Sequence, residues 1–356
     1  MAAGALAPPT AFAAPKQDTV QQGLNALVRE GQPAALASVK DSEGRTRTYV
    51  AGVGNLATGA KVPRDGQVRI GSNTKTFTAV VVLQLVGEGK VDLEASVDTY
   101  LPGLVRGEGI DGNRITVRQL LQHTSGIPEY SEDISDEELP YRYFEPRDLV
   151  DIALKHKAEF EPGKKWSYSN TNYVLAGLII QKVTGRPLAE EIDRRVIKKI
   201  GLRHTYFPAP GDKSIREPHP RGYHRTKAGE PLRDFTELDP SAGWAAGQMI
   251  STNSDLNRFF GKLLGSDLLL AEAQRTQMRT TVPIEGTQFH YGLGLMSRPL
   301  SCGGVYWGHG GDIAGYETRG GVTDAGRAAN VAVTSIPMEK AGINGVQKVV
   351  DTALCS

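Results

Sequence analysis

A serine and a lysine three residues apart stand where a helix is expected to begin. The stretch IGSNTKTF, residues 70–77, places Ser72 and Lys75 at positions i and i+3, ahead of residues with the apolar spacing of a helix. Side chains at these positions lie on one face of a helix. A lysine whose pKa is lowered by burial can take the proton of a serine and make it a nucleophile. The alternative is a helix cap followed by a solvated lysine, because Ser-x-x-Lys is short enough to occur by chance.

Two later motifs carry further candidates. WSYSN holds Tyr168 and Asn170 just before an expected helix, and WGHGGD holds His309 at the end of an expected strand. Taken alone, Tyr168 fits a half-buried aromatic residue, Asn170 a helix cap and His309 a structural histidine. Tyrosine and histidine side chains are also groups that transfer protons in enzymes. The order of the three motifs along the chain therefore matters more than any one of them.

Composition excludes several classes of function. The 356 residues include 41 Lys and Arg against 40 Asp and Glu, a formal net charge of +1, with no basic run or acidic tail. This balance gives no reason to expect nucleic acid or a membrane surface as a partner. The longest apolar run, residues 79–83, is far shorter than the ~20 residues that span a bilayer. We therefore expect a soluble protein. The HExxH motif and other spacings of metal ligands are missing from the sequence, so we also expect no metal and no cofactor.

The start of the chain and its two cysteines bear on localisation. Residues 1–15 are small, apolar and uncharged, and the Ala-Phe-Ala of residues 11–13 resembles a secretory cleavage site. We interpret residues 1–17 as the remnant of a signal peptide, with a disordered start as the alternative, and expect a secreted protein. In a secreted protein Cys302 and Cys355 would form a disulfide, which contributes about 4 kcal/mol in the chain-entropy model. In a cytosolic protein they would be two unrelated thiols.

The expected helices and strands suggest one sheet interrupted by a helical insertion. Helices are expected at residues 19–31, 76–90, 115–123, 145–156, 170–185, 187–201, 252–265 and 342–354, and strands at residues 34–40, 46–53, 290–298, 303–311, 316–322 and 329–336. The economical fold is of the α/β (α+β) class. Residues 18–75 and 286–356 form an antiparallel sheet flanked by the N- and C-terminal helices, and residues 76–285 form a large, mainly helical lobe. Ser72 lies at the junction, and a cleft between lobes is a usual place for an active site.

The ordered motifs resemble those of the penicillin-recognising serine hydrolases, which include DD-peptidases and class C β-lactamases. The Ser-x-x-Lys, Tyr-x-Asn and His-x-Gly motifs follow one another in the order of this superfamily. Stretches such as ITVRQLLQHTSGI, and the C-terminal pair of cysteines, are similar to the secreted actinomycete D-alanyl-D-alanine carboxypeptidases. The likeness covers residues 18–356, and it implies a β-lactamase/transpeptidase-like fold.

The resemblance implies a role for each residue of the first two motifs. Ser72 would attack an amide or ester carbonyl and form an acyl-enzyme. Lys75 and Tyr168 would share the proton transfers, and which of the two is the general base stays open. Asn170 would hold the acyl-side amide of the substrate and help to orient Lys75. His123 resembles a residue of a loop at the active-site wall, and we interpret it as structural.

The third motif would complete the site. His309 is placed with the catalytic residues. The backbone N–H groups of Ser72 and Asp312 match the oxyanion hole of the family, which stabilises the charge that develops on the substrate oxygen. Gly310 and Gly311 belong to the same substrate and oxyanion region.

The chain departs from the carboxypeptidase pattern at the positions that hold a substrate carboxylate. The family pattern has threonine where this chain has Gly310 and Asp312, and an arginine that aligns with Met296. Arg298, two positions further on, would keep the same face of a strand. A free carboxylate would be repelled by Asp312, whereas an α-ammonium group would be attracted.

These departures favour a D-stereospecific amidohydrolase or aminopeptidase that acts on D-amino-acid amides, esters or short peptides. The first alternative is a D-alanyl-D-alanine carboxypeptidase that uses Arg298 for the carboxylate. The second is a binding or sensor module that is acylated by β-lactams without turnover. The expected partners are therefore a small-molecule or short-peptide substrate with a D-amino acid, and β-lactams that would bind covalently.

Overall fold

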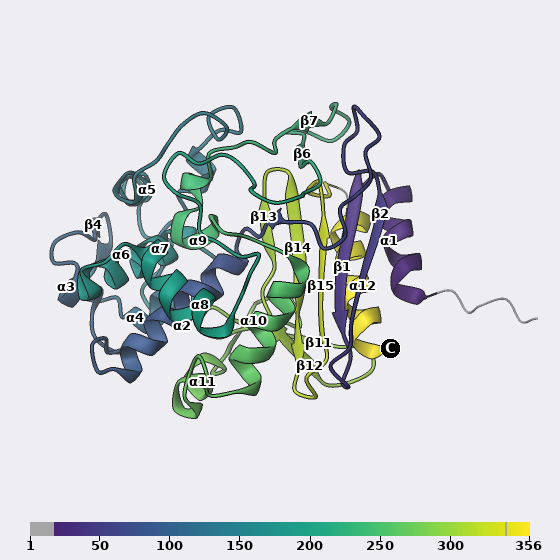
Figure 1. Cartoon of the computed structure of the whole chain (residues 1–356). Helices are drawn as coiled ribbons and strands as arrows, with labels where there is room; N and C mark the ends of the chain where they lie inside the picture. Colours follow the sequence, from purple (N-terminus) through teal and green to yellow (C-terminus); the bar gives the residue numbers. More distant parts are fainter. Residues whose placement is uncertain (1–17, 339) are drawn as a thin grey trace, which may run out of the picture.

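The computed structural model describes residues 18–338 and 340–356. The expected signal-peptide remnant at residues 1–17 lies outside the described residues. Figure 1 shows an antiparallel sheet packed beside a group of helices, so the predicted fold class is confirmed. Helices near the two chain ends, α1 (Thr19–Arg29) and α12 (Lys340–Cys355), lie side by side on the outer face of this sheet.

The main sheet has nine strands in the order β2-β1-β15-β14-β12-β11-β10-β9, and β13 pairs with β14. All of its neighbouring strands are antiparallel. The N-terminal hairpin therefore pairs with strands from the C-terminal part of the chain, as predicted. The strands are β1 (Ala34–Lys40), β2 (Thr46–Gly52), β9 (Val282–Pro283), β10 (His290–Tyr291), β11 (Met296–Pro299), β12 (Val305–Gly308), β13 (Gly311–Ile313), β14 (Tyr316–Thr323) and β15 (Ala328–Val333).

The centre of the sheet is built from small side chains because both of its faces are covered. All six residues of β15, AANVAV, are buried. On the outer face, α1 contributes Val20, Leu24 and Leu27, which recur at helical spacing and pack in one cluster with the apolar residues of α12. A Cβ atom at Gly23 would lie 2.8 Å from Val349, so glycine allows α1 and α12 to approach closely.

Helix α10 (Asn253–Gly265) covers the inner face of the sheet. Thr252 caps the helix by accepting a hydrogen bond from the backbone of Asp255. The Asn257 side chain then donates to the carbonyl of Ser38 at 2.8 Å and accepts from Asn330 at 2.9 Å. Because α10 and β9 both associate with the sheet, the sheet-associated part of the chain includes residues N-terminal to position 286.

The remaining helices gather around α2, which the sequence predicts as a helix with one apolar stripe. Twelve residues of α2 are buried and cover all of its sides, because α6, α7, α9 and α11 all pack against it. These helices are α2 (Asn73–Gly87), α3 (Val97–Tyr100), α4 (Val117–Leu121), α5 (Pro146–Ala153), α6 (Asn170–Thr184), α7 (Leu188–Ile192), α8 (Lys198–Ile200), α9 (Trp244–Gly247) and α11 (Glu272–Met278). Short 3-10 or π-helical turns occur at η1 (Ser131–Asp133), η2 (Asp193–Ile197) and η3 (Pro240–Ala242). Three small two-stranded ladders join β3 (Val68–Arg69) to β8 (Ile250–Ser251), β4 (Arg106–Gly107) to β5 (Ile110–Asp111), and β6 (Tyr223–His224) to β7 (Arg233–Asp234).

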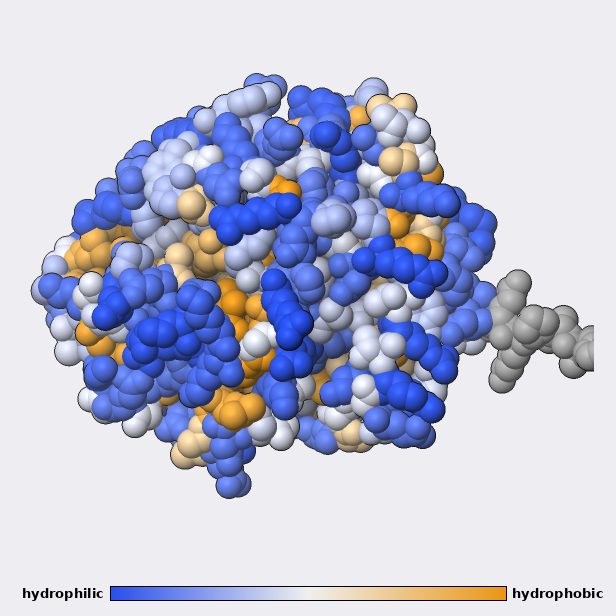
Figure 2. All heavy atoms as spheres, in the orientation of Figure 1, coloured by the Kyte–Doolittle hydropathy of each residue, from blue (hydrophilic) through white to orange (hydrophobic). Residues whose placement is uncertain are grey.

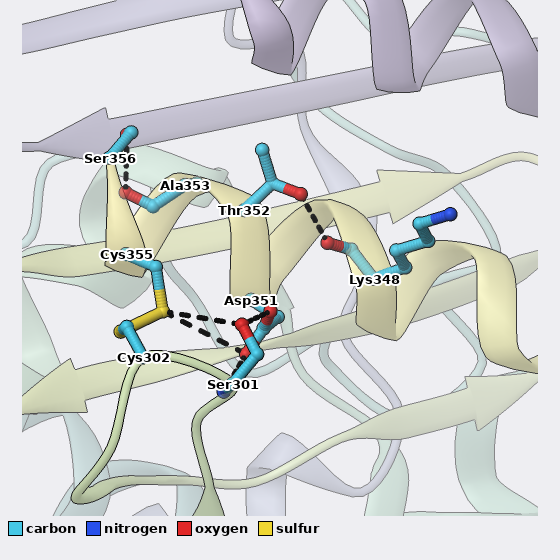
Figure 3. The surroundings of a disulfide bond; sticks show 8 residues. All are labelled: Ser301, Cys302, Lys348, Asp351, Thr352, Ala353, Cys355 and Ser356. Atoms are coloured by element: carbon cyan, nitrogen blue, oxygen red, sulfur yellow. Dashed lines mark hydrogen bonds between the residues drawn. A yellow bond between two sulfur atoms is a disulfide. The ribbon is translucent and has the colours of Figure 1, made fainter.

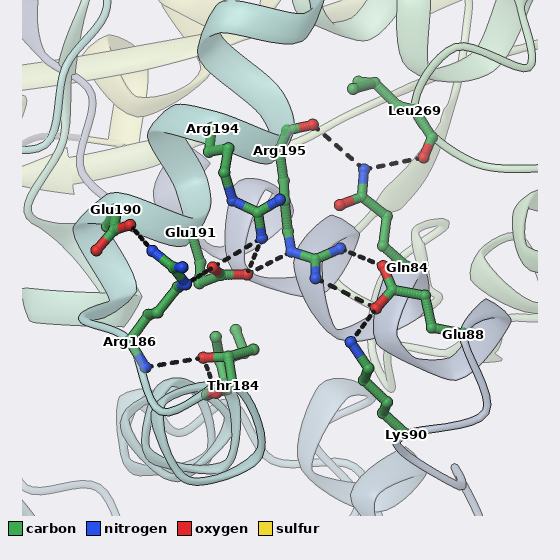
Figure 4. A network of polar contacts seen from close by, with 11 residues as sticks. Gln84, Glu88, Lys90, Thr184, Arg186, Glu190, Glu191, Arg194, Arg195 and Leu269 are labelled. Atoms are coloured by element: carbon green, nitrogen blue, oxygen red, sulfur yellow. Dashed lines mark hydrogen bonds and ion pairs between the residues drawn. The ribbon is translucent and has the colours of Figure 1, made fainter.

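A buried ionic network holds the C-terminal end of α2 (Figure 4). Arg195 pairs on one side with Glu88, which follows α2, and on the other with Glu191 of α7. The Glu191 side chain is fully buried and also accepts two hydrogen bonds from Arg194, at 2.9 and 3.1 Å. Two arginines therefore neutralise one buried carboxylate and link two helices.

A disulfide fixes the end of the chain, as predicted (Figure 3). Cys302 lies in the turn between β11 and β12, and Cys355 is the last residue of α12, with 5.7 Å between their Cα atoms. Beside the disulfide, the backbone N–H of Ser301 donates to Asp351 at 2.8 Å. The C-terminal helix is therefore tied to the edge of the β11–β12 hairpin.

None of the helices in residues 18–338 and 340–356 is long and apolar enough to cross a bilayer. The face of the molecule in Figure 2 is mainly hydrophilic, and apolar atoms show in the middle of the view, between the mainly helical part and the sheet.

The buried Glu191 should contribute more to stability than its exposed neighbour. We expect Glu191→Gln to lower the free energy of unfolding by about 2 kcal/mol, because it leaves buried arginine charge without its full compensation. Glu190→Gln is the matched control: Glu190 pairs with Arg186 on the surface, and its loss should cost no more than about 0.5 kcal/mol. Urea unfolding of both variants measures the difference. Equal midpoints would show that the buried network contributes nothing specific.

Candidate active site

The Ser72 hydroxyl points toward a lysine and does not cap the helix that follows it. Ser72 precedes the first residue of α2, and its side chain makes no capping hydrogen bond. Gly71 reaches this turn with φ +47°, in the left-handed region that favours glycine. Lys75, one turn into α2, lies with its Nζ atom 2.9 Å from Ser72 Oγ. The structure therefore favours the catalytic interpretation of the Ser-x-x-Lys motif over the helix cap.

Lys75 is fully buried, and three oxygen atoms surround its amine. Besides Ser72 Oγ, the Nζ atom lies 2.6 Å from Asn170 Oδ1 and 2.8 Å from the backbone carbonyl of Ala246. Burial lowers the pKa of Lys75 to about 7, against the attraction of the Glu129 and Asp312 carboxylates, which raises it. Lys75 therefore loses its proton at a much lower pH than a solvated lysine does.

The geometry around Lys75 fixes how a neutral amine must be oriented. A neutral amine has two hydrogen atoms and one lone pair. The Asn170 and Ala246 oxygens belong to carbonyl groups and can only accept, so both hydrogen atoms point to them. The lone pair then faces Ser72 Oγ, whose hydroxyl must be the donor. This is the arrangement that a general base requires.

Burial shifts the pKa of Tyr168 in the opposite direction from that of Lys75. Burial raises the pKa of its phenol well above the usual value. The Lys75 Nζ atom lies 4.9 Å from the centre of the Tyr168 ring. At neutral pH the neutral Lys75 amine can accept a proton, whereas Tyr168 keeps its proton and can only donate it. The structure thus favours one of the two assignments that the sequence leaves open.

A chain of hydrogen bonds beside Tyr168 runs from His123 through Tyr291 to His309. The backbone N–H of Ser169 donates to His123 Nδ1 at 3.2 Å, so the His123 proton is on Nε2, which donates to Tyr291 Oη at 3.2 Å. Tyr291 donates in turn to His309 Nε2 at 2.9 Å, and His309 Nδ1 donates to the carbonyl of Gly310 at 2.5 Å. A backbone N–H can only donate and a carbonyl can only accept, so every proton in this chain has one position.

The two histidines of these hydrogen bonds, His123 and His309, lie at different distances from Tyr168. The His123 ring packs 4.4 Å from the Tyr168 ring, centre to centre, and His309 lies 6.5 Å from Tyr168 by the same measure. Burial and the charge of Lys75 lower the pKa of His309 to about 3, so His309 is neutral at physiological pH. The contacts of His309 are therefore suited to positioning Tyr291 and the third motif, and its direct catalytic role stays a prediction.

Asn170 joins Lys75 to a carboxylate that sequence analysis did not identify. While its side chain accepts from Lys75, its backbone N–H donates to Glu129 Oε2 at 2.6 Å. Asn170 is the first residue of α6, so Glu129 also lies at a helix N-terminus, where negative charge is stabilised. Glu129 comes from the loop after HTSGIP, and no spacing rule links it to the three motifs.

Strand β13 approaches the Ser72 turn so closely that glycine is needed. A Cβ atom at Gly311 would lie 1.9 Å from the Ile70 carbonyl and 2.9 Å from the Ser72 nitrogen, and one at Gly71 would lie 2.9 Å from the Asp312 nitrogen. The backbones of Ser72 and Asp312 are therefore neighbours. That their N–H groups form an oxyanion hole stays a prediction, and the close approach of the two backbones is consistent with it.

Ser72 opens into a pocket of about 180 Å³ that has a largely apolar wall. Its polar lining includes Ser72, Asn170 and Asp312, so residues from all three motif regions meet in one place. The other lining residues are Tyr130, Ser131, Leu139, Leu238, Asp239, Pro240, Ala242, Gly243, Ala246, Gly247, Ile313 and Ala314.

Two predicted residues have partners that the sequence did not suggest. Asp312 forms a two-point ion pair with Arg319 of β14, at 2.7 and 3.1 Å. Arg298 donates to Gln347 of α12 at 2.7 Å and lies 4.6 Å from the centre of the Phe289 ring. The Asp312 charge is thus compensated, and the Arg298 guanidinium is held against the C-terminal helix.

The comparisons with known proteins agree with this geometry. The family described as Beta-lactamase matches residues 18–341. The chain belongs to the beta-lactamase family.

Two solved structures are similar over nearly their whole length. A D-stereospecific amidohydrolase from Streptomyces sp. has 40% sequence identity and a TM-score of 0.87, covering 96% of this chain and 98% of that chain. The D-amino acid amidase from Ochrobactrum anthropi SV3 has 27% identity and a TM-score of 0.83, covering 94% and 96%. Protein flp of Staphylococcus aureus is 34% identical over 145 residues, which span 41% of this chain but only 29% of that protein.

The state of Lys75 predicts how the rate of acylation should depend on pH. Neutral Lys75 is the active form, and its fraction rises with pH, so we expect kcat/KM to rise through about pH 7 and then level off. Because the Tyr168 pKa is raised, no decrease should follow below about pH 10. Hydrolysis of p-nitrophenyl acetate, which does not ionise in this range, measures the profile, and Ser72→Ala gives the background. A profile that falls between pH 6 and 8 would contradict the assignment of Lys75 as base.

Proposed function

We propose that the protein is a serine amidohydrolase that acts on D-amino-acid amides, esters or short peptides with a D residue in the acyl position. The single observation that carries the proposal is the buried Lys75 amine, whose Nζ atom lies within hydrogen-bond distance of Ser72 Oγ and of two carbonyl acceptors. The D-stereospecificity is supported by the similarity to the Streptomyces amidohydrolase and the Ochrobactrum amidase.

The reaction follows from the protonation states of the site. Lys75 takes the Ser72 proton while Ser72 Oγ attacks the carbonyl carbon, which gives a tetrahedral intermediate. The carbon–nitrogen bond then breaks as Tyr168 gives its proton to the leaving amine, and the Lys75 ammonium restores that proton to Tyr168. A water molecule hydrolyses the acyl-enzyme by the same proton route. The backbone N–H groups of Ser72 and Asp312 would stabilise the oxyanion.

The charge near Ser72 supports a substrate with a free amine. Glu129 is half-buried, and its hydrogen bonds come from the backbone N–H groups of Ser131 and Asn170, so no cation neutralises it by direct contact among the described residues. Asp312, by contrast, is paired with Arg319. We therefore assign the α-ammonium group of the substrate to Glu129, and the sequence-based assignment to Asp312 is revised.

The apolar wall of the pocket supports an apolar D side chain. Leu139, Leu238 and Ile313 lie there with several alanines and Pro240, and a volume of about 180 Å³ suits a medium-sized aliphatic or aromatic group. A D-alanyl-D-alanine carboxypeptidase that uses Arg298 is less well supported, because that guanidinium is directed to Gln347. Covalent acylation of Ser72 by β-lactams and secretion of the protein stay part of the proposal.

The experiment compares D- and L-leucine amide with N-acetyl-D-leucine amide. We expect turnover of the D-amide, at least tenfold slower turnover of the L-amide, and none with Ser72→Ala. Glu129→Gln should lower kcat/KM for D-leucine amide about tenfold, which corresponds to 1.4 kcal/mol, and should change the N-acetylated substrate little. Equal rates for D- and L-leucine amide would contradict the proposed stereospecificity, and equal losses on both D-substrates would contradict the role of Glu129.

A further inference from the structure

The ion pair between Asp312 and Arg319 joins a cleft residue to a largely buried cation. Asp312 is 51% exposed and lines the pocket with Ser72, whereas Arg319 is only 14% exposed. Both guanidinium ends contact the carboxylate, at 2.7 and 3.1 Å, and Arg319 also donates to the carbonyl of Thr318 at 2.8 Å. This fork geometry is the one in which arginine binds a carboxylate most specifically.

Arg319 lies where the family resemblance leads us to expect a carboxylate-binding group. A Cβ atom at Gly310 would be 3.0 Å from Arg319 Nη1, so the guanidinium lies directly beside the third motif. Gly310 and Asp312 replace the two threonines of the carboxypeptidase pattern. Arg319, which sequence analysis did not identify, therefore supplies positive charge at this place, while Arg298 is held by Gln347.

Arg319 contacts two carboxylates, and Asp312 makes more of these contacts than Glu317 does. Glu317 is also close, with Oε1 3.0 Å from Arg319 Nη2, but its side chain is almost fully buried. Burial raises the pKa of Glu317 to about 7, although Arg319 lowers it, so Glu317 is ionised only in part near pH 7. Removing the Asp312 carboxylate would free the two guanidinium contacts that it makes at the cleft.

We propose that Asp312 occupies Arg319 in the place of a substrate carboxylate, and that it thereby excludes leaving groups that end in a free carboxylate. The inference rests on the proposed amidohydrolase function and adds its leaving-group specificity. Asp312 acts by occupation: its carboxylate takes the two guanidinium contacts that a ligand carboxylate would use. Leaving groups without a carboxylate, such as ammonia, alcohols or C-terminally amidated residues, are not affected.

A pair of dipeptides that differ only in the carboxylate tests this proposal. The substrates are D-Leu-Gly and D-Leu-Gly amide, and the measured product is free D-leucine. We expect Asp312→Asn to raise the ratio of kcat/KM for the acid over that for the amide by at least about fivefold. A general effect of the substitution on the ammonium group or on catalysis is common to both substrates and cancels in the ratio.

Two further variants isolate the role of Arg319. The double variant Asp312→Asn/Arg319→Gln should lose the gain, because no cation remains for the carboxylate. The matched control is Asp324→Asn, since Asp324 also pairs with an arginine, Arg279, but lies in the turn at the far end of the β14–β15 hairpin. The ratio for this control should equal that of the wild type.

The possible outcomes separate this inference from the proposed function. An unchanged ratio in Asp312→Asn, with both dipeptides cleaved, overturns the inference and leaves the proposed function in place. A gain that persists in the double variant also overturns it, since Arg319 is then not the binding group. If Asp312→Asn does not fold, Asp312→Thr is subject to the same criteria. Loss of the proposed function would instead show as wild-type protein that cleaves no D-leucine amide.

Discussion

The structure of the site depends on the burial of one amine. Lys75 lies inside the protein with three oxygen atoms around it, and this burial is what lowers its pKa to about 7. A solvated lysine would keep a charge of +1 and could not take the Ser72 proton at neutral pH. Helix α2 is therefore buried on all sides, Asn170 is held by Glu129, and α9 supplies the Ala246 carbonyl, because each of these features keeps water away from the amine or orients it.

The two parts of the fold have different functions around this amine. Helices α2 and α6 provide Lys75 and Asn170, and the loop before α6 provides Tyr168; to Lys75 and Tyr168 we assign the proton transfers. The sheet provides β13, whose glycine approaches the Ser72 turn within a distance that excludes any side chain. The chain His123–Tyr291–His309 joins the two parts, since His123 lies in the turn after α4, Tyr291 in β10 and His309 directly after β12. The ion pair of Asp312 and Arg319 then determines which charges the cleft presents.

The sequence predicts the parts of this site that local rules govern. Ser72 and Lys75 are neighbours because of helical periodicity, and Cys302 and Cys355 form the expected disulfide. The order of elements was enough to place the first hairpin and the last strands in one sheet. Contacts between distant side chains were not predictable in this way. Glu129, Tyr291 and Arg319 belong to no motif, and the partners of Asp312 and Arg298 depend on which strand faces which helix. Only the tertiary packing shows that Asp312 is neutralised.

The most direct test of this account is a measurement of the protonation of Lys75 itself. NMR titration of protein labelled with 13C at the lysine Cε atoms reports the pKa of each lysine, and the Lys75 signal is assigned by its loss in Lys75→Arg. The account predicts that one signal titrates near pH 7 and disappears in this variant. A Lys75 signal that titrates above pH 10, like that of a solvated lysine, would contradict the central claim.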